Sequence, residues 1–513
     1  GGRRAAVIHR AEGATPAAAE QHPAMPGVEA VRSLSGYAWS VVGVTALGFF
    51  MRVFLLGSPP LWRDEAFSAV VVRGGWLDML EVVRHDSAPP LSYLILKLAN
   101  TASSSPASLR MVSVLAGTAM VPTAAALGRR VGGNRAAILA ATAMAVIPAY
   151  VVQARDVRMY ALASAFVLAS YLALWRAVEK PTFGRLAVYA ACVALALYSQ
   201  YFSLAAVGGG LVAAAIVLRP PPRVLVRLGI AAAVGVLALV PWLVAAVPQF
   251  QHAGSPFWVE PVGISRIEDL WQEFVAGDTL RSQYPHAVEI NLLRLLACAA
   301  AAVGGLGWVA LAWHSKAEAR RRAVFLAAAG LVAVGALILV SFFRPLYDSR
   351  YAAVLEVPIV VAVGAGFAWL WPQRRPLGLL VAGTALALLA AHALALGPNP
   401  PNDDIRPLLD PLAGQVRDGD FVAVNGPTQY FTVIYYTDAE TQARTHMIAA
   451  STRWYDGAAQ YRADTWMTSI PSDVSGRVYV LAEDTAAPLP MPAGYAQREQ
   501  RCAATYCLTT WGR

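Results

Sequence analysis

Long apolar runs constrain the fold of this chain more than any other feature of its sequence. About eleven stretches rich in Ala, Val and Leu recur along it, many of them close to 20 residues long. A helix of about 20 residues spans the roughly 30 Å hydrocarbon core of a bilayer. Only 14% of the 513 residues are charged, whereas a soluble protein has about a quarter. We therefore predict a polytopic α-helical membrane protein with spans near residues 38–57, 107–128, 134–151, 157–177, 185–198, 201–218, 225–247, 290–313, 323–342, 350–371 and 377–396.

The basic loops predict the orientation of these spans, because cytoplasmic loops carry an excess of Lys and Arg. One apolar segment, 87–102, is ambiguous, since it is short, begins with Pro89-Pro90 and contains Lys97. If it lies in the membrane interface, the basic loops all fall on one side, at 128–135, 176–185, 219–227, 314–322 and 372–376. This arrangement gives about eleven spans with juxtamembrane helices, a cytoplasmic N-terminus, and Asp64 on the outer face of the plasma membrane.

The last part of the chain differs from the rest. After residue 398 it contains nine Arg, no Lys and thirteen Asp and Glu, with alternating apolar runs. Residues 420–426 and 476–484 predict strands, and 428–436 predicts a helix between them. We expect a small soluble extracytoplasmic α/β domain there, in which Cys502 and Cys507 can form a disulfide. The predicted organisation is a disordered cytoplasmic tail at 1–36, a transmembrane catalytic domain at 37–397 and the α/β domain at 398–513.

Charge and ligand-type residues argue against two classes of function. The net charge of +9 comes from short basic clusters between spans and not from one basic patch, so nucleic acid is not an expected partner. No tight spacing of His, Asp and Glu predicts a metal site. A site assembled from His85, His252 and Glu260 is the weaker alternative.

Two acids directly after the first span are the first candidates for chemistry. Asp64 and Glu65 lie in the stretch LWRDEAFS, residues 61–68. Acids in the first turn of a helix also complement its dipole, which would explain one carboxylate without any function. Arg52 lies inside the outer end of the same span, where an arginine is costly unless it snorkels or faces a polar cavity. The loop that follows adds His85 and Asp86.

Two further polar clusters are predicted on the same membrane face. Asp156 and Arg158 interrupt apolar sequence in QARDVRMY, where an interfacial snorkelling pair is the alternative explanation. A late loop, FFRPLYDSRY, brings another group that also fits an ordinary short loop: Arg344, Asp348, Arg350 and Tyr351. Together the clusters suggest an outward cavity lined by carboxylates and guanidiniums. Arginines suit a phosphate group, and a nearby carboxylate suits removal of a proton from a hydroxyl.

The order of these parts resembles the GT-C glycosyltransferases that use a polyprenyl-phosphate sugar, a class containing protein O-mannosyltransferases and lipid A aminoarabinose transferases. The matching pieces cover about residues 45–360: LWRDEAFS, HDSAPPLSYLILK, QARDVRMYAL and PLYDSRYAAVLEVPIV. One piece departs from the family, since many relatives have His-Pro-Pro or Lys-Pro-Pro where this chain has Ala88-Pro89-Pro90.

The resemblance implies roles for individual residues. Asp64 matches the catalytic base, Glu65 is its neighbour, and Asp156 matches a second acid of the site. The resemblance also places Arg350 and Tyr351 near the donor phosphate. From their positions in the sequence, Arg158 and Arg52 are further candidates for holding it. Possible substrate-binding residues are His85, Asp86, Arg344 and Trp258, although an interfacial anchor is the favoured explanation for Trp258. No cofactor or metal is expected beyond the lipid-linked donor.

These expectations combine into a predicted reaction. An inverting transferase would move a sugar, mannose before arabinofuranose, from a polyprenyl phosphate to a glycan or glycolipid of the cell envelope. The Ala-, Val- and Arg-rich composition favours a GC-rich, actinobacterial origin. The alternative is a polytopic transporter or flippase of an envelope precursor, which would usually show Gly/Pro-broken helices in two related halves.

Overall fold

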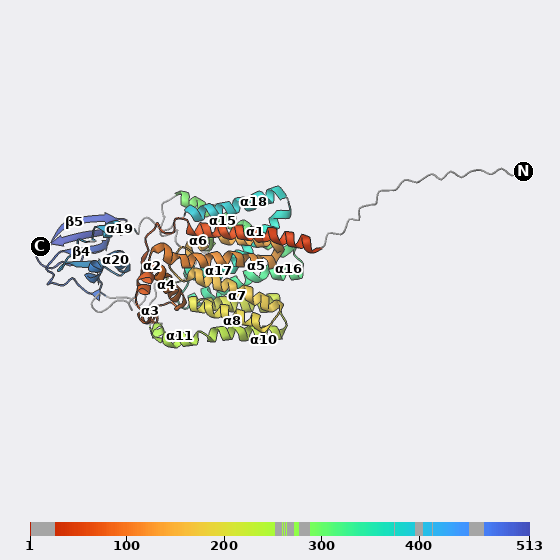
Figure 1. The fold of residues 1–513 in the computed structure, drawn as a ribbon, viewed down its shortest axis with the longest axis horizontal. Helices are drawn as coiled ribbons and strands as arrows, with labels where there is room; N and C mark the ends of the chain where they lie inside the picture. The colour runs from red at the N-terminus through yellow and green to blue at the C-terminus, as the bar shows by residue number, and fades with distance from the viewer. Residues whose placement is uncertain are drawn as a thin grey trace.

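The structure of the chain is a computed structural model (Figure 1). It describes residues 1, 26–251, 259, 261, 263, 271–275, 288–373, 375–395, 404–412, 414–450 and 466–513. A bundle of long helices forms the centre of the molecule. Helix α1 begins at one end of the bundle, and the C-terminal sheet lies beyond the other end. This arrangement agrees with the prediction that the N-terminus and the C-terminal domain lie on opposite sides of the membrane.

Eight helices in the described part of the chain are long and apolar enough to cross a membrane. Two shorter apolar helices accompany them, α8 (Phe183–Ser199) and α9 (Ser203–Ala213), the latter continued by a π-helical turn. Each predicted apolar run overlaps at least one helix, although the number that cross a membrane stays a prediction. The long helices are α1 (Pro26–Val53), α5 (Pro106–Val146), α7 (Tyr160–Glu179), α10 (Pro222–Leu237) continued by α11 (Val240–Ala245), α15 (Val288–His314), α16 (Ala317–Ser341), α17 (Ser349–Gln373) and α18 (Arg375–Ala395).

Helix α5 is two helices joined by a tight turn. The backbone of Gly132 and Gly133 is not helical, and Gly133 has a φ of 74°, a conformation that glycine adopts without strain. Residues twelve positions apart in one straight helix would be about 18 Å from each other. A Cβ atom at Gly128 would nevertheless meet the side chain of Ala140. The chain therefore reverses direction here, which agrees with the two separate runs predicted at 107–128 and 134–151.

Helix α17 lies at the centre of the bundle and α1 at its edge. Within their most apolar windows, 78% of α17 residues are buried but only 17% of those of α1. Small residues allow the central helix to approach its neighbours closely, because a Cβ at Gly364 would collide with the backbone of Ala140 and one at Gly366 with that of Gly304. The remaining apolar side chains of α1, such as Trp39 and Phe50, face outwards, as lipid contact would require.

Three short helices cover the end of the bundle that faces the C-terminal sheet: α2 (Arg63–Arg73), α3 (Trp76–Val83) and α4 (Leu91–Ala102) (Figure 1). At 12 residues α4 is about 18 Å long, too short to cross the hydrocarbon core. Its Lys97 donates to the carbonyls of Val72 and Gly74, so this cation closes the C-terminal end of α2. The position of α4 thus agrees with the predicted juxtamembrane helix.

The C-terminal residues form a six-stranded sheet in the order β3-β2-β1-β4-β6-β5. The first four strands are parallel, and β6 pairs antiparallel with β4 and β5. The predicted strands at 420–426 and 476–484 correspond to β1 (Phe421–Asn425) and β4 (Val478–Glu483). The other elements are α19 (Arg406–Leu409), α20 (Tyr430–Tyr436), α21 (Ala439–Ala443), β2 (Thr445–Ile448), β3 (Trp466–Met467), β5 (Ala496–Ala503) and β6 (Tyr506–Gly512).

A disulfide joins the two antiparallel strands at the edge of this sheet. Cys502 of β5 pairs directly with Cys507 of β6 in the strand register and is bonded to it. The disulfide predicted from the sequence is therefore present. Asp484 lies close to both sulfur atoms, but because these are bonded to each other they offer no thiolate to a metal ion.

Candidate active site

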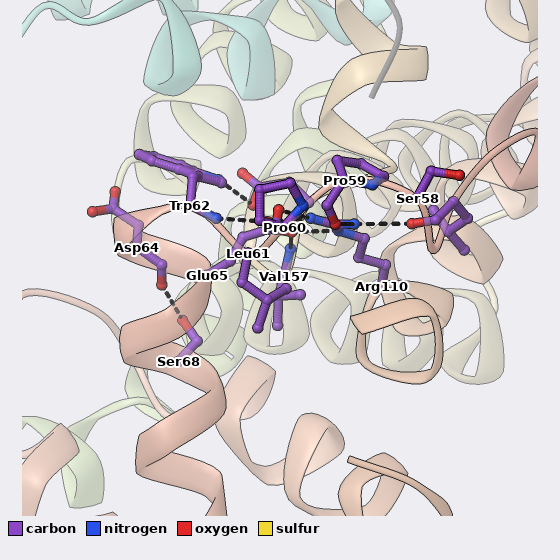
Figure 2. Close-up of polar contacts among 12 residues, drawn as sticks. Ser58, Pro59, Pro60, Leu61, Trp62, Asp64, Glu65, Ser68, Arg110 and Val157 are labelled. Carbon is purple, nitrogen blue, oxygen red and sulfur yellow. Dashed lines mark hydrogen bonds and ion pairs between the residues drawn. The ribbon is translucent and has the colours of Figure 1, made fainter. Parts of the chain in front are cut away.

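A buried arginine fixes the position of α2 at the end of the bundle. Arg110, on the first turns of α5, donates to the carbonyls of Leu56 and Pro59 at 2.9 and 3.1 Å and to that of Pro60 at 2.8 Å. Its remaining donors reach both oxygens of Glu65, at 2.7 and 2.5 Å (Figure 2). One guanidinium thus holds the turn after the first span and the helix that follows it.

The neighbouring acids Glu65 and Asp64 point in different directions (Figure 2). Glu65 is directed towards Arg110, is 1% exposed, and also accepts hydrogen bonds from the backbone N–H groups of Val157 and Trp62 at 3.0 and 3.3 Å. With these donors its carboxylate is fully engaged by the protein. Glu65 was predicted beside the base, and this geometry gives it the surroundings of a positioning residue.

Asp64 has a different environment. Its side chain is 22% exposed, and its two oxygens lie 3.3 Å from Nε of Arg63 and 3.5 Å from Nη1 of Arg350. Burial alone would raise the pKa of this carboxyl, but the positive charges of Arg158, Arg63 and Arg350 outweigh it, so the pKa falls below its usual value. Asp64 is therefore ionised at neutral pH, and one side remains open to an incoming group.

Asp156 lies on the other side of Trp62. The indole N–H of Trp62 donates to Oδ1 of Asp156 at 3.1 Å, and the Arg350 guanidinium lies over the same ring, 5.8 Å from its centre. Burial and repulsion from Glu65 raise the pKa of Asp156 to about 7. Two nearby acids, Asp64 and Asp156, thus have pKa values displaced in opposite directions, a pattern common at sites of proton transfer.

Arg158 connects the loop before α7 to α2. Its Nη1 donates to the hydroxyl of Ser68 at 3.3 Å, and that hydroxyl donates to the backbone carbonyl of Asp64 at 2.9 Å. The charge of Arg158 also acts on Asp86, which accepts a hydrogen bond from Tyr93 at 2.8 Å. Burial raises the pKa of Asp86 despite the attraction of this arginine. The predicted residues Arg158 and Asp86 therefore belong to the same charged cluster as Asp64.

The start of α17 supplies the other arginine. Nε of Arg350 donates to Asp348 at 3.0 Å while Nη1 lies near Asp64, so this side chain is held between two carboxylates. Tyr351 is 8% exposed and its ring stacks on Phe202, with the ring centres 4.7 Å apart. Arg350 thus lies at the end of the bundle beside Asp64, whereas the ring of Tyr351 is packed inside the bundle against Phe202.

Arg52, predicted at the donor phosphate, has different partners. It is 0% exposed, and its guanidinium donates to the carbonyls of Gly48, Met144 and Ala145 at 2.8, 3.0 and 3.1 Å. The carbonyl of Met144 would normally accept from residue 148, but Pro148 has no N–H. Arg52 therefore satisfies the carbonyls at a helix end that a proline leaves open. This geometry does not give the side chain access to a phosphate.

Two other predicted residues, His85 and Arg344, are not brought into the cluster by the structure. The Nδ1 atom of His85, in the turn after α3, lies 2.9 Å from the carbonyl of Glu81 near the end of that helix. The side chain of Arg344 is partly exposed and makes no hydrogen bond or ion pair with the described residues. Trp258 lies outside the residues that the structure describes. Their roles stay predictions.

The C-terminal domain contacts α2 through α20. The Tyr436 hydroxyl accepts a hydrogen bond from the backbone N–H of Leu61 at 2.7 Å, three residues before Asp64. Farther along α2, Phe67 packs edge-to-face on Phe431 with ring centres 5.1 Å apart. At the end of α2, the Arg73 guanidinium lies 4.1 Å from the ring centre of Tyr435. One face of α2 therefore packs on the bundle and another on the C-terminal domain.

Sequence reasoning missed Arg110, Trp62, Ser68 and Tyr436. Arg110 gave a usable signal, since a charge in the second turn of an apolar run needs a buried partner. Trp62 and Ser68 lie inside LWRDEAFS and were not given separate roles. Tyr436 belongs to a segment distant in sequence, and nothing in its neighbourhood predicts contact with Leu61.

Residues 86–246, less than half of the chain, match the family described as dolichyl-phosphate-mannose-protein mannosyltransferase. The sequence matches no curated protein. Among solved structures, ArnT from Cupriavidus metallidurans in the apo state is similar with a TM-score of 0.65 at 12% identity, covering 93% of this chain and 98% of that one. ArnT bound to undecaprenyl phosphate gives 0.56 at 13% identity, with the same coverage.

An archaeal enzyme shares the architecture over slightly less of the chain. The oligosaccharyltransferase of Archaeoglobus fulgidus, in its apo form, gives a TM-score of 0.54 at 12% identity, covering 87% of this chain and 69% of that one. The fold is of the GT-C type. The predicted fold class, a multi-pass helical membrane protein with a small C-terminal α/β domain, is thereby confirmed. At these identities the likeness establishes the fold alone.

Proposed function

We propose that this chain is an inverting membrane glycosyltransferase that uses a polyprenyl-phosphate sugar. The observation that carries the proposal is the placement of Asp64, a partly exposed and ionised carboxylate 3.5 Å from Arg350, at the end of the bundle next to the juxtamembrane helices. An acid beside cations at a membrane edge suits a reaction between a hydroxyl in water and a phosphate ester anchored in lipid. The matched family and the fold relatives support the same class.

Asp64 acts in this proposal as the general base. The acceptor hydroxyl transfers its proton to the carboxylate while its oxygen attacks the anomeric carbon of the donor sugar. The bond from that carbon to the phosphate oxygen breaks, and its electron pair leaves with the phosphate. Because attack and departure occur on opposite faces of the carbon, the configuration at that centre inverts.

Arg350 and Arg158 hold the leaving phosphate. Guanidinium groups bind phosphate oxygens through paired, charge-assisted hydrogen bonds. In the absence of donor, Arg350 is paired with Asp64 and Asp348. An arriving phosphate competes with Asp64 for this cation. As the positive charge near Asp64 is neutralised, the pKa of its carboxyl rises from its lowered value, and the carboxylate becomes a stronger base when donor is present.

The remaining assignments extend the proposal to substrate and compartment. The donor is a polyprenyl-phosphate mannose, with arabinofuranose as the second choice, and the acceptor is an envelope glycan or glycolipid on the outer face of the plasma membrane. Support comes from the mannosyltransferase description of the matched family and from undecaprenyl phosphate in one fold relative. No metal or other cofactor is required in this mechanism.

The test is direct transfer by purified protein in lipid nanodiscs. Polyprenyl-phosphate mannose and polyprenyl-phosphate arabinofuranose are each incubated with short mannan and arabinan acceptors. Mass spectrometry should detect an acceptor extended by one sugar, together with free polyprenyl phosphate, for the mannose donor. Transfer from the arabinose donor alone would correct the choice of sugar, and no transfer from either would reject the function.

A further inference from the structure

A cavity lies in the C-terminal sheet, and none of the residues around Asp64 lines it. Its volume is about 210 Å³, and its lining includes the ends of two neighbouring parallel strands. Asn425 is the last residue of β1, Glu483 is the last residue of β4, and Asp484 follows directly. All three line the cavity. Val480 of β4 and Thr509 and Trp511 of β6 also line it, so the cavity lies over one face of β4, β6 and β5 and extends to the carboxyl ends of β1 and β4.

The strand order makes this a place where ligands bind. After β1 the chain runs through α20 and α21 to β2, on one side of β1 in the sheet. After β4 it runs to β5 and β6, which lie on the opposite side of β4. Because the two connections lead in opposite directions, the carboxyl ends of β1 and β4 mark a topological switch point, and one end of the cavity lies there. In open α/β sheets ligands bind at switch points of this kind.

The walls of the cavity supply polar groups and one aromatic ring. Side chains from β5 and β6 form one wall: Gln497, Gln500, Thr509 and Trp511. The segment after β4, with Ala487 and Met491, forms another. The amide of Asn425 donates to the carbonyl of Ala487 at 3.2 Å and so ties this segment to the end of β1. The site therefore has a fixed rim.

The composition of the walls selects a class of ligand. No Lys or Arg occurs among the lining residues, all of which belong to the described part of the chain. The carboxylates of Glu483 and Asp484 would repel a phosphate, which argues against a nucleotide or the lipid-linked donor. The volume is below the roughly 300–1,000 Å³ of sites for drug-sized molecules. Carboxylate and amide groups beside an indole suit the hydroxyls and the apolar face of one sugar ring.

We propose that this cavity binds a neutral sugar unit of the acceptor glycan. The proposal rests on the transferase function and extends it with a second binding site. The C-terminal domain contacts α2 through α20, so a glycan held in its cavity stays attached to the unit that carries Asp64. An acceptor of several sugars can then be retained by the sheet while its end is extended.

Binding is measured on the full chain in nanodiscs, without donor, by saturation-transfer NMR with linear mannotetraose and linear arabinotetraose. One of these neutral oligosaccharides should bind. Gln500→Ala and Asp484→Asn should each weaken its binding by about tenfold, through the loss of a hydrogen-bonding group or its charge. Both side chains are exposed, so these variants should fold.

Glu499→Gln is the matched control, because it neutralises an exposed acid on β5 that does not line the cavity. Unchanged binding in the two cavity variants, or no binding of either oligosaccharide, would overturn the proposal. Since the assay needs no donor and no turnover, it separates this site from the transferase function. Binding without detectable transfer would support the cavity while rejecting the reaction.

Discussion

The carboxylate of Asp64 lies 3.5 Å from the guanidinium of Arg350, although 286 positions of sequence separate the two residues. Asp64 belongs to α2, which covers the end of the bundle, and Arg350 to α17, which passes through its centre. The contact joins the proposed base to the proposed phosphate-binding group before any substrate is present. A donor phosphate would replace this ion pair with its own.

A first prediction concerns pH. The Asp156 carboxyl, whose folded pKa is about 7, retains its proton in the native state, whereas an unfolded Asp releases it near pH 4. Stability should therefore fall as pH rises from about 4 to 7 and should then level off. Melting temperatures from pH 5 to 8 should decline less steeply for Asp156→Asn than for the natural chain. Equal slopes of melting temperature against pH in the two proteins would show that the pKa of Asp156 is not raised.

A second prediction concerns the buried pair of Glu65 and Arg110. Glu65→Gln leaves the Arg110 charge buried without its partner, which typically costs about 3–5 kcal/mol. We expect a large fall in melting temperature together with reduced transfer. Glu179→Gln is the control, because its ion pair with Arg130 is exposed and should contribute at most about 1 kcal/mol. Equal effects of the two changes would argue against a positioning role for Glu65.

The sequence predicts the elements of the fold better than the contacts within the candidate site. Apolar runs, the Pro89-Pro90 helix and the alternating strands β1 and β4 are local patterns, and each predicted its element correctly. Packing partners are not local. The sequence shows that Arg52 lies deep in a span, but a phosphate and the carbonyls left open by Pro148 would satisfy that charge equally well.

The same limit explains what was missed. A charged residue in an apolar helix indicates that it has a polar partner, but it does not identify that partner. Arg110 therefore could not be linked to Glu65 from spacing alone. The acids of LWRDEAFS could be selected as a pair, but their opposite directions depend on how α2 packs between the bundle and the C-terminal domain. That domain carries no motif that identifies Tyr436 as a contact of Leu61.

A third prediction tests this contact. Tyr436→Phe removes the acceptor of the Leu61 N–H, and an unmade buried hydrogen bond costs about 1–3 kcal/mol. Loosening the turn before α2 should lower kcat by up to about tenfold while donor affinity changes little. Tyr495→Phe is matched to it, since that hydroxyl bonds only within the C-terminal domain. If the two variants have the same kcat, the hydrogen bond between Tyr436 and Leu61 has no effect on the site.

A fourth prediction concerns topology. The basic loops place the turn at Gly132 in the cytoplasm and the domain that contains Arg513 outside. Reporter fusions at these two positions should therefore report opposite sides of the membrane. If both report the same side, the predicted number of spans between them is wrong, and the C-terminal domain shares a side of the membrane with the basic loop at Gly132.

The central claim is that Asp64 removes the acceptor proton. Asp64→Asn keeps the shape of the side chain but cannot accept a proton at neutral pH, so transfer should fall by about 10²–10⁴-fold. Asp78→Asn, an exposed acid on α3, is the matched control and should transfer normally. Arg350→Ala should instead weaken donor binding first.

The most direct measurement compares donor binding and sugar transfer in the same preparation of Asp64→Asn protein. The account predicts that the variant folds, binds polyprenyl-phosphate sugar about as well as the natural chain, and transfers almost none of it. Near-normal transfer by a folded Asp64→Asn protein would contradict the assignment of Asp64 as the base.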